Sequence, residues 1–108
     1  AYTVYRECYQ SAFHVLRVAV CSWLARDLAA VDRCSTPWVV LGLHRPLMVG
    51  YTHKDKRVVG DHLRDYIEEL LLEYKVDMTI AGHVHTYYRT CRARAERCTD
   101  DGSGITHF

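Results

Sequence analysis

Residues 37–46 read PWVVLGLHRP, and this stretch decides the fold of the chain. Within it, residues 38–43 form a short apolar run that is rich in β-branched side chains and shows no polar alternation. Such a run is typical of a strand buried on both faces of a parallel sheet. His44 follows the run directly, so we predict a buried strand that ends at a histidine.

A second short strand is predicted at residues 77–81 (DMTIA), followed by Gly82 and His83. Between the two strands, residues 58–75 carry one apolar stripe at three- and four-residue steps, which predicts an amphipathic helix. A strand, a helix of this length and another strand imply two parallel strands joined by a crossover. The sequence therefore predicts an α/β fold.

Further elements are predicted on both sides of this core. Residues 11–31 repeat apolar side chains at helical spacing and predict a helix before the first strand. Residues 44–56 have no period and predict a long loop, and long ordered loops often carry function. The sequence after Thr86 is mostly polar and is interpreted as an extended tail, with residues 105–108 as the start of another strand.

The composition excludes several classes of protein. The chain has 108 residues, 49% of them hydrophobic and 25% charged, which fits one folded domain and not a disordered segment. Its net charge of +1 is too small for sequence-independent electrostatic binding to nucleic acid or to an anionic membrane. The apolar run at residues 18–25 is far shorter than a membrane span. We therefore expect neither a nucleic acid nor a membrane partner.

Five cysteines leave at least one thiol unpaired. Cys91 and Cys98 form a close pair in a polar, arginine-rich stretch, where a disulfide would close a short loop and would suit an oxidising compartment. A zinc pair is the less favoured interpretation, because zinc ligands are usually separated by two to four residues. Cys8, Cys21 and Cys34 show no spacing pattern and are interpreted as buried or free thiols.

Three of the seven histidines follow the two predicted strands: His44 follows the first, and His83 and His85 follow the second. Ligand sites of parallel sheets lie beyond the carboxyl ends of the strands, so these side chains are expected within reach of one another. Neutral imidazoles are good ligands for zinc and iron, which predicts a metal site. The alternative is that these histidines are polar loop residues satisfied by backbone groups.

Three segments in this order carry a resemblance: residues 37–46, a tyrosine-bearing loop with His53, and residues 74–90 (YKVDMTIAGHVHTYYRT). Together they resemble the C-terminal part of the catalytic domain of purple acid phosphatases, in the calcineurin-like metallophosphoesterase superfamily. The resemblance covers residues 23–108 and implies a partial, truncated α/β/β/α sandwich. Residues 1–22 resemble nothing expected in that family and are interpreted as an atypical or foreign segment.

The resemblance also implies roles for single residues. His44 and His83 would bind a divalent metal (Zn, Fe or Mn), and His85 would bind a ferric ion. His53 matches a histidine that contacts phosphate and protonates the leaving group, and Arg45 is a weaker candidate for attracting phosphate. A solvated loop histidine and an arginine paired with a carboxylate are the alternatives for these two residues.

The activity implied by the resemblance is the hydrolysis of phosphate monoesters by attack of metal-bound hydroxide at a dinuclear centre. The resemblance further supports a disulfide between Cys91 and Cys98, and a secreted, vacuolar or lysosomal location is the expectation. Non-catalytic metal binding, or a purely structural remnant of a phosphatase, is the alternative function.

The sequence departs from this family by what it lacks. The family's site also needs two aspartates, a tyrosine and an asparagine from motifs that precede residues 23–33. This chain has no asparagine, and its single Gly-Asp pair, Gly60-Asp61, lies inside a predicted helix. We therefore expect the missing N-terminal half of the catalytic domain to act as a partner, the isolated chain to be inactive, and the strands to expose apolar surface.

Overall fold

The fold is described from a computed structural model, which describes residues 14–50 and 54–108, with side chains at 19–50 and 60–108. The chain divides into two compact units between Pro37 and Trp38. The first contains helix α2 (His14–Ala29), and the second contains helix α3 (Lys54–Glu73) and every strand found in the described residues.

Helix α2 lies within the predicted range of residues 11–31. Its buried side chains recur at helical spacing, as the apolar stripe predicts, and they are Cys21, Leu24, Ala25 and Leu28. Trp23 belongs to the same sequence stripe but is 56% exposed, so the buried face is narrower than the sequence indicates. Cys21 is buried, as one of its two interpretations states, but it is disulfide-bonded and so is not a thiol. Cys34 is a free, exposed thiol.

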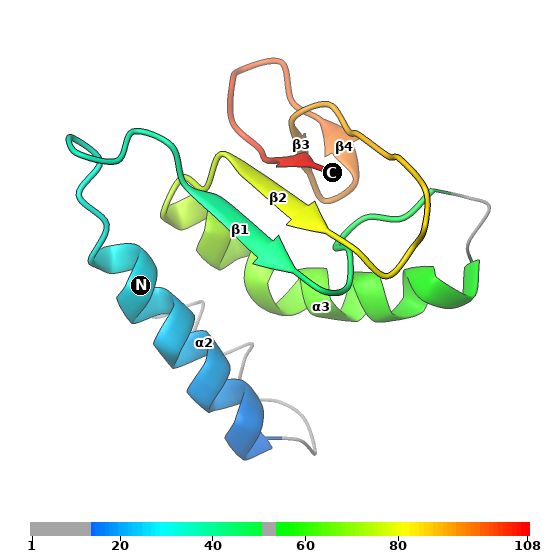
Figure 1. The fold of residues 1–108 in the computed structure, drawn as a ribbon, viewed down its shortest axis with the longest axis horizontal. Helices are drawn as coiled ribbons and strands as arrows, with labels where there is room; N and C mark the ends of the chain where they lie inside the picture. Colours follow the sequence, from blue (N-terminus) through cyan, green and yellow to red (C-terminus); the bar gives the residue numbers. More distant parts are fainter. Residues whose placement is uncertain (1–13, 51–53) are drawn as a thin grey trace. The chain divides into compact units, whose positions relative to one another are not determined.

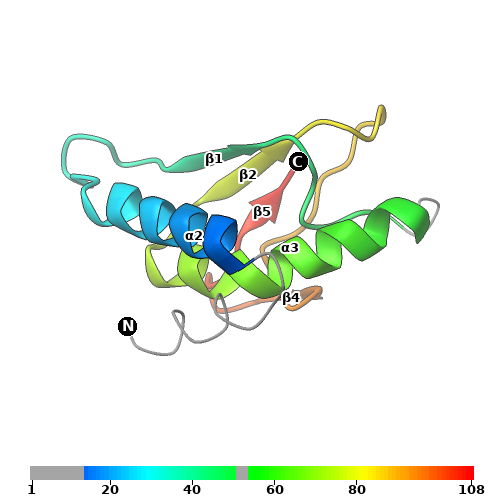
Figure 2. The same cartoon turned by 90° about the horizontal axis from the view of Figure 1, so that it is seen from below.

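The second unit is built on a three-stranded parallel sheet in the order β1-β2-β5, drawn in Figures 1 and 2. The strands are β1 (Val40–Leu43), β2 (Met78–Ala81) and β5 (Thr106–His107). Both predicted strands are confirmed, and the start of another strand predicted at residues 105–108 is confirmed as β5. Helix α3 (Lys54–Glu73) runs along one face of the sheet (Figure 2).

Helix α3 begins four residues before the start that the apolar stripe predicts. Residues 54–57 (KDKR) carry no apolar periodicity, but lysine and arginine are good helix formers, and the helix includes them. The helix ends in a Schellman motif: Lys75 adopts a left-handed φ of 53°, Val76 N–H donates to Leu71 O at 2.8 Å, and Lys75 N–H donates to Leu72 O at 3.1 Å. This turn directs the chain into β2.

The core of the unit lies between the sheet and α3. Its most deeply buried apolar residues are Leu47, Leu70, Leu71, Val76, Ala93 and Ile105. The opposite face of the sheet is open in the described structure, since Val40 is 47% exposed and Ile80 is 52% exposed. The expectation of exposed apolar strand residues is therefore confirmed.

The segment interpreted as an extended tail contains a hairpin instead. Strands β3 (Ala93–Arg94) and β4 (Arg97–Cys98) pair in antiparallel fashion through a two-residue turn. Ala95 and Glu96 both have positive φ there, at 47° and 63°, as a tight hairpin turn requires. The sequence does not predict this turn, because glycine or asparagine usually occupies such positions and this chain has alanine and glutamate there.

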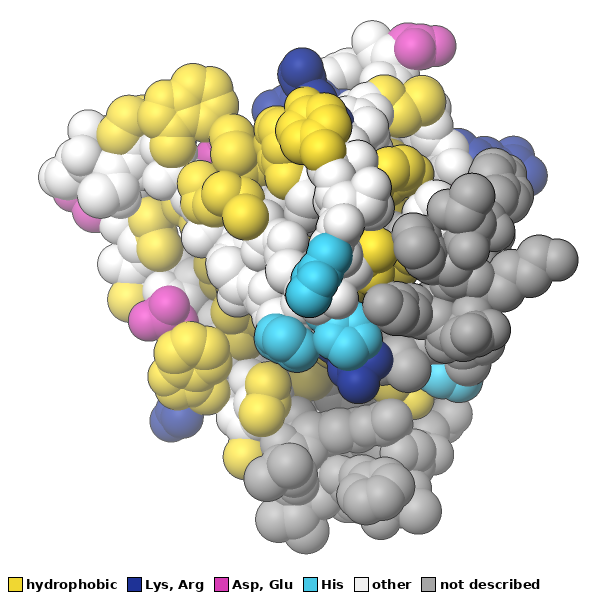
Figure 3. Space-filling view, turned by 45° about the vertical axis from the view of Figure 1, so that its right-hand side comes forward, with side chains coloured by type: hydrophobic (Ala, Val, Ile, Leu, Met, Phe, Trp, Pro, Cys, Tyr) yellow, Lys and Arg dark blue, Asp and Glu magenta, His cyan; other side chains and the backbone are white. Residues whose placement is uncertain are grey.

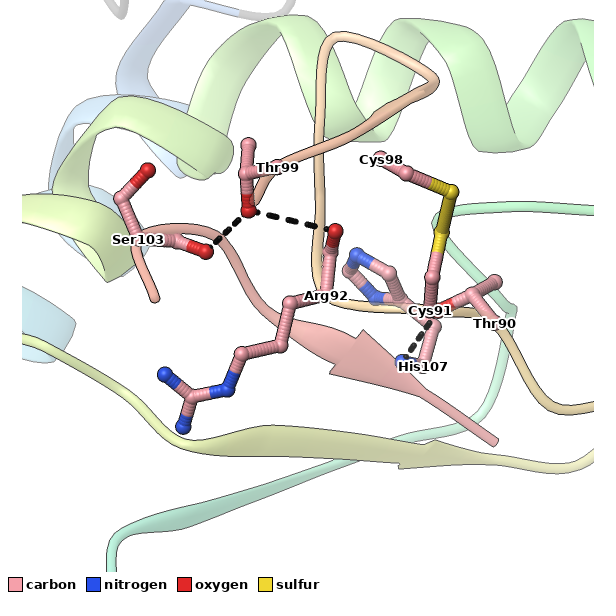
Figure 4. The surroundings of a disulfide bond; sticks show 7 residues. All are labelled: Thr90, Cys91, Arg92, Cys98, Thr99, Ser103 and His107. Atoms are coloured by element: carbon pink, nitrogen blue, oxygen red, sulfur yellow. Dashed lines mark hydrogen bonds between the residues drawn. A yellow bond between two sulfur atoms is a disulfide. The ribbon is translucent and has the colours of Figure 1, made fainter. Parts of the chain in front are cut away.

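Contacts with α3 compensate for the unfavourable turn residues. The carboxylate of Glu68 accepts the N–H of Ala95 at 3.1 Å, and Arg94 pairs with both carboxylate oxygens of Glu69 at 2.9 and 3.0 Å. The predicted disulfide is present, with 2.04 Å between the sulfur atoms of Cys91 and Cys98, and it closes the base of the hairpin (Figure 4).

Candidate functional site

The candidate site lies at the carboxyl ends of β1 and β2. The last residues of the two strands, Leu43 and Ala81, are paired, so His44 and Gly82 come next at the same edge of the sheet. The N–H of Gly82 donates to the carbonyl oxygen of His44 at 3.2 Å and continues the ladder by one step. His83 then leaves the sheet.

The backbone of His83 has a φ of 65°, in the left-handed region that non-glycine residues rarely adopt. Two short hydrogen bonds tighten the same segment: Val84 N–H donates to Gly82 O at 2.7 Å, and Thr86 N–H donates to Val84 O at 2.8 Å. Backbone strain of this kind costs roughly 1–3 kcal/mol and persists where the surrounding structure fixes it. The strained turn directs the His83 side chain toward His44.

The two imidazoles are in contact. Nδ1 of His83 lies 3.2 Å from Nε2 of His44, and the rings meet edge to face with centroids 5.1 Å apart. Nη1 of Arg45 lies 3.2 Å from Nε2 of His83. Because arginine can only donate, Nε2 of His83 accepts this hydrogen bond, and a neutral His83 then donates from Nδ1 to His44. Figure 3 shows histidine side chains gathered on this face beside a basic side chain.

The other predicted site residues are less closely placed. His85 is exposed and follows His83 by two residues. Within residues 14–50 and 54–108, no group of three or more His, Cys, Asp or Glu side chains is arranged to hold a metal ion. His53 lies outside the described residues. The structure thus brings His44 and His83 together, with Arg45 beside them.

The spacing of the His44 and His83 nitrogens fits a shared metal ion. Two nitrogen ligands on a tetrahedral zinc, each roughly 2.0–2.1 Å from the metal, lie roughly 3.3 Å from one another. The observed separation is 3.2 Å. The pair can supply two of the ligands such an ion needs once the hydrogen bond between the rings is replaced by bonds to the metal.

The comparisons with known proteins agree with this architecture. The protein named Fe(3+)-Zn(2+) purple acid phosphatase 12 from Arabidopsis thaliana is 36% identical over 92 residues, which are 85% of this chain and 19% of that protein. An acid phosphatase from Aspergillus ficuum is 45% identical over 67 residues, which are 62% of this chain and 10% of that protein. No family model matches the chain.

Among solved structures, the purple acid phosphatase PPD1 from yellow lupin (Lupinus luteus) seeds superimposes with a TM-score of 0.69 and 29% sequence identity. The match covers 80% of this chain and 17% of that protein. The chain belongs to the purple acid phosphatase family. The predicted partial α/β fold is confirmed by the same match, and the chain spans less than a fifth of the length of these relatives.

A cavity of about 400 Å³ lies next to the histidine edge of this purple acid phosphatase chain. Pro46 from the segment after β1 and Gly82 and Val84 from the segment after β2 form part of its wall, so the wall includes neighbours of both His44 and His83. The rest of the lining is largely apolar and aromatic, and it includes Met48, Val49, Tyr87, Tyr88 and Phe108.

Sequence reasoning did not single out His107, which is buried on the α3 side of the sheet and is 2% exposed. Nδ1 of His107 lies 2.7 Å from Oγ1 of Thr79, its partner in the β2–β5 register, and its Nε2 has no hydrogen-bond partner in the described structure. Burial, and secondarily the positive charge of Arg64, lower the pKa of His107 to about 4. The sequence predicts a strand at residues 105–108 but not its neighbour. Pairing of that strand with β2 is what places His107 beside the buried Thr79.

Proposed function

We propose that this chain supplies histidine ligands to the dinuclear metal site of an acid phosphatase that hydrolyses phosphate monoesters. The observation that carries the proposal is the approach of His83 to within 3.2 Å of His44 across two parallel strands. Neutral imidazoles at the open end of a parallel sheet form a metal site that solvent and substrate can reach.

In this proposal His44 and His83 bind a divalent ion (Zn, Fe or Mn), and His85 binds Fe(III). A relative with 36% identity carries Fe(3+) and Zn(2+) in its name, which supports this pair of metals. Bound metal ions would neutralise the negative charge of a phosphoryl group during hydrolysis. His53 is proposed to contact the phosphate and to protonate the leaving group, because an imidazolium can do both in acid.

Arg45 is proposed to assist phosphate binding. Its guanidinium donates to Nε2 of His83 in the described structure, and metal binding at Nδ1 would leave the ring proton on Nε2 and so break this hydrogen bond. A displaced guanidinium next to the site would be free to donate charge-assisted hydrogen bonds to phosphate oxygens. The apolar cavity beside the histidines is proposed to hold the organic part of the ester.

The proposed partner is the N-terminal half of the catalytic domain, since the chain spans 19% or less of its relatives. The exposed apolar positions Val40 and Ile80 support a further element packing on the sheet. The Cys91–Cys98 disulfide supports an oxidising location, secreted, vacuolar or lysosomal. Within the described residues, no helix is long and apolar enough to cross a membrane.

The test uses the complete enzyme that contains this chain. Replacement of His44, His83 or His85 with alanine should abolish hydrolysis of p-nitrophenyl phosphate at acidic pH and reduce the metal content measured by elemental analysis. His62→Ala is the matched control, because His62 is exposed on α3 and should change neither quantity. Unchanged metal content in all three site variants would refute the proposal.

A second candidate function applies to the isolated 108 residues, namely metal binding without turnover. It is favoured because the described residues hold no group of three or more His, Cys, Asp or Glu side chains arranged for a metal, so the His44–His83 pair by itself does not complete a catalytic ligand set. Metal analysis and a phosphatase assay on the purified chain separate the two functions. Bound metal without turnover supports the second function, and robust turnover contradicts it.

A further inference from the structure

The segment after β1 is held in place by α3. At Gly60 the helix passes so close to this segment that a Cβ added there would lie 2.7 Å from the carbonyl oxygen of Pro46 and 3.5 Å from that of Leu47. No real Cβ tolerates the shorter distance, and the obstacle is backbone that cannot rotate away. Glycine at this position therefore lets α3 touch the segment that carries His44.

Arg64 lies one helical turn further along α3 and holds the same segment. Its Nη1 donates to the carbonyl oxygen of Leu47 at 3.3 Å, and Leu47 itself is 1% exposed. The same Nη1 lies 3.1 Å from Asp61 and 3.3 Å from Glu96, and the Arg64 side chain is 10% exposed. Two carboxylates thus balance the buried charge and fix the guanidinium where it reaches the loop.

The Pro46 and Leu47 carbonyls lie close in the sequence to His44, the proposed metal ligand. Only Arg45 separates His44 from Pro46, and the proline ring fixes φ at its own position. A displacement of the Pro46 or Leu47 carbonyl is therefore transmitted to His44 through a short, stiff segment. Groups behind metal ligands that orient them typically change metal affinity by about 10- to 100-fold when removed.

We propose that Gly60 and Arg64 are positioning residues, which fix the Pro46–Leu47 backbone and thereby the distance from His44 to His83. The consequence for metal binding rests on the proposed function, whereas the consequence for the backbone does not. Neither residue touches the histidines; both act through the segment at residues 44–50.

The test is a Zn²⁺ titration and an amide hydrogen-exchange measurement on the 108-residue chain. Arg64→Met should weaken Zn²⁺ binding by roughly tenfold and should speed exchange at residues 45–50, while exchange in β2 stays unchanged. Arg64→Lys should give an intermediate result, because the lysine ammonium can still donate to the Leu47 carbonyl but lacks the planar fork of the guanidinium. Zn²⁺ affinity and exchange rates within about twofold of wild type in Arg64→Met would overturn the proposal.

The matched control is Arg94→Met. Arg94 also joins the hairpin to α3, through Glu69 at 2.9 Å, and in the described structure neither a hydrogen bond nor an ion pair joins its side chain to residues 44–50. This variant should match wild type in both measurements. An equal effect of Arg94→Met would show that any loss of a helix–hairpin contact suffices, which would also overturn the proposal.

Gly60→Ala separates a local displacement of residues 46–47 from a general loss of folding, which could also weaken Zn²⁺ binding in Arg64→Met. Alanine favours the helix, so helicity by circular dichroism should be retained or increased, while the added Cβ displaces Pro46. Weakened Zn²⁺ binding with intact helicity supports the proposal, and unchanged binding contradicts it. If the wild-type chain binds no Zn²⁺, the second candidate function fails, and the exchange rates alone decide the positioning role.

Discussion

Nδ1 of His83 lies 3.2 Å from Nε2 of His44, although 39 positions separate the two residues in the sequence. The parallel register of β1 and β2 produces this approach, because it ends both strands at the same edge of the sheet. The strained backbone of His83 completes it by turning the chain as it leaves the sheet. The proposed metal site is therefore a property of the strand pairing as much as of the histidines.

Removal of the Arg45 side chain should strengthen metal binding at this pair. The guanidinium stabilises the His83 tautomer that has its proton on Nδ1, the nitrogen proposed to bind the metal, and its positive charge opposes a second cation nearby. Arg45→Met should raise the Zn²⁺ affinity of the chain by about fivefold, or roughly 1 kcal/mol at the high effective dielectric of an exposed site. Isothermal titration calorimetry at constant pH and ionic strength measures the change.

The charge-matched control for this prediction is Arg97→Met, on the exposed β4 strand. It removes the same net charge at a position outside the histidine pair. An equal rise in affinity in both variants would show that net charge, and not the Arg45 contact, limits metal binding.

The buried His107 should make the fold less stable in acid. Its pKa is about 4 in the folded chain, against 6.5 for an ordinary histidine. As the pH falls from 6.5 to 4, the unfolded chain binds a proton that the folded chain does not, so the free energy of unfolding decreases by up to roughly 3 kcal/mol. Above pH 6.5 this contribution is fully present.

His107→Gln tests that prediction, since glutamine does not titrate and can still hydrogen-bond to Thr79. Urea unfolding at pH 7.5, 5.5 and 4.5 should show a shallower loss of stability in the variant than in wild type. The difference between the two proteins removes the contribution of carboxylates common to both. Parallel pH profiles would show that His107 is protonated in the folded chain as readily as in the unfolded one.

The disulfide should stabilise the hairpin by constraining the unfolded chain. Cys91 and Cys98 are seven positions apart, and a loop this short corresponds to about 2 kcal/mol. The double variant Cys91→Ser/Cys98→Ser should lose this amount in urea unfolding under non-reducing conditions. Cys34→Ser is the control, because Cys34 is a free, exposed thiol and its replacement should leave stability unchanged.

The open sheet face should cause self-association of the isolated chain. Val40 and Ile80 are apolar and about half exposed. Ile80→Lys should shift the chain toward monomer in sedimentation velocity, with an unchanged circular dichroism spectrum. Glu73→Lys, which introduces the same residue at the exposed end of α3, should leave association as it is. If both variants associate like wild type, the contact surface lies elsewhere.

The amino-acid sequence determined the order of the central elements, because local patterns carry that information. The apolar runs at residues 38–43 and 77–81 and the helical stripe between them predict β1, α3 and β2 with small errors at the ends. The spacing of Cys91 and Cys98 in a polar stretch likewise favoured the disulfide that is present. The histidines that follow the two strands could be predicted as site candidates because their positions in the sequence are fixed relative to the strand ends.

Only the tertiary structure decided the features that depend on distant contacts. The β3–β4 hairpin has a turn that no local rule predicts, and it is held by Glu68 and Glu69 of α3. His107 became a buried group only through its pairing with Thr79, and Arg64 gained its role only where α3 meets Leu47. Periodicity reports which face of an element is apolar, whereas the partner of each polar group is set by the packing of elements far apart in the chain.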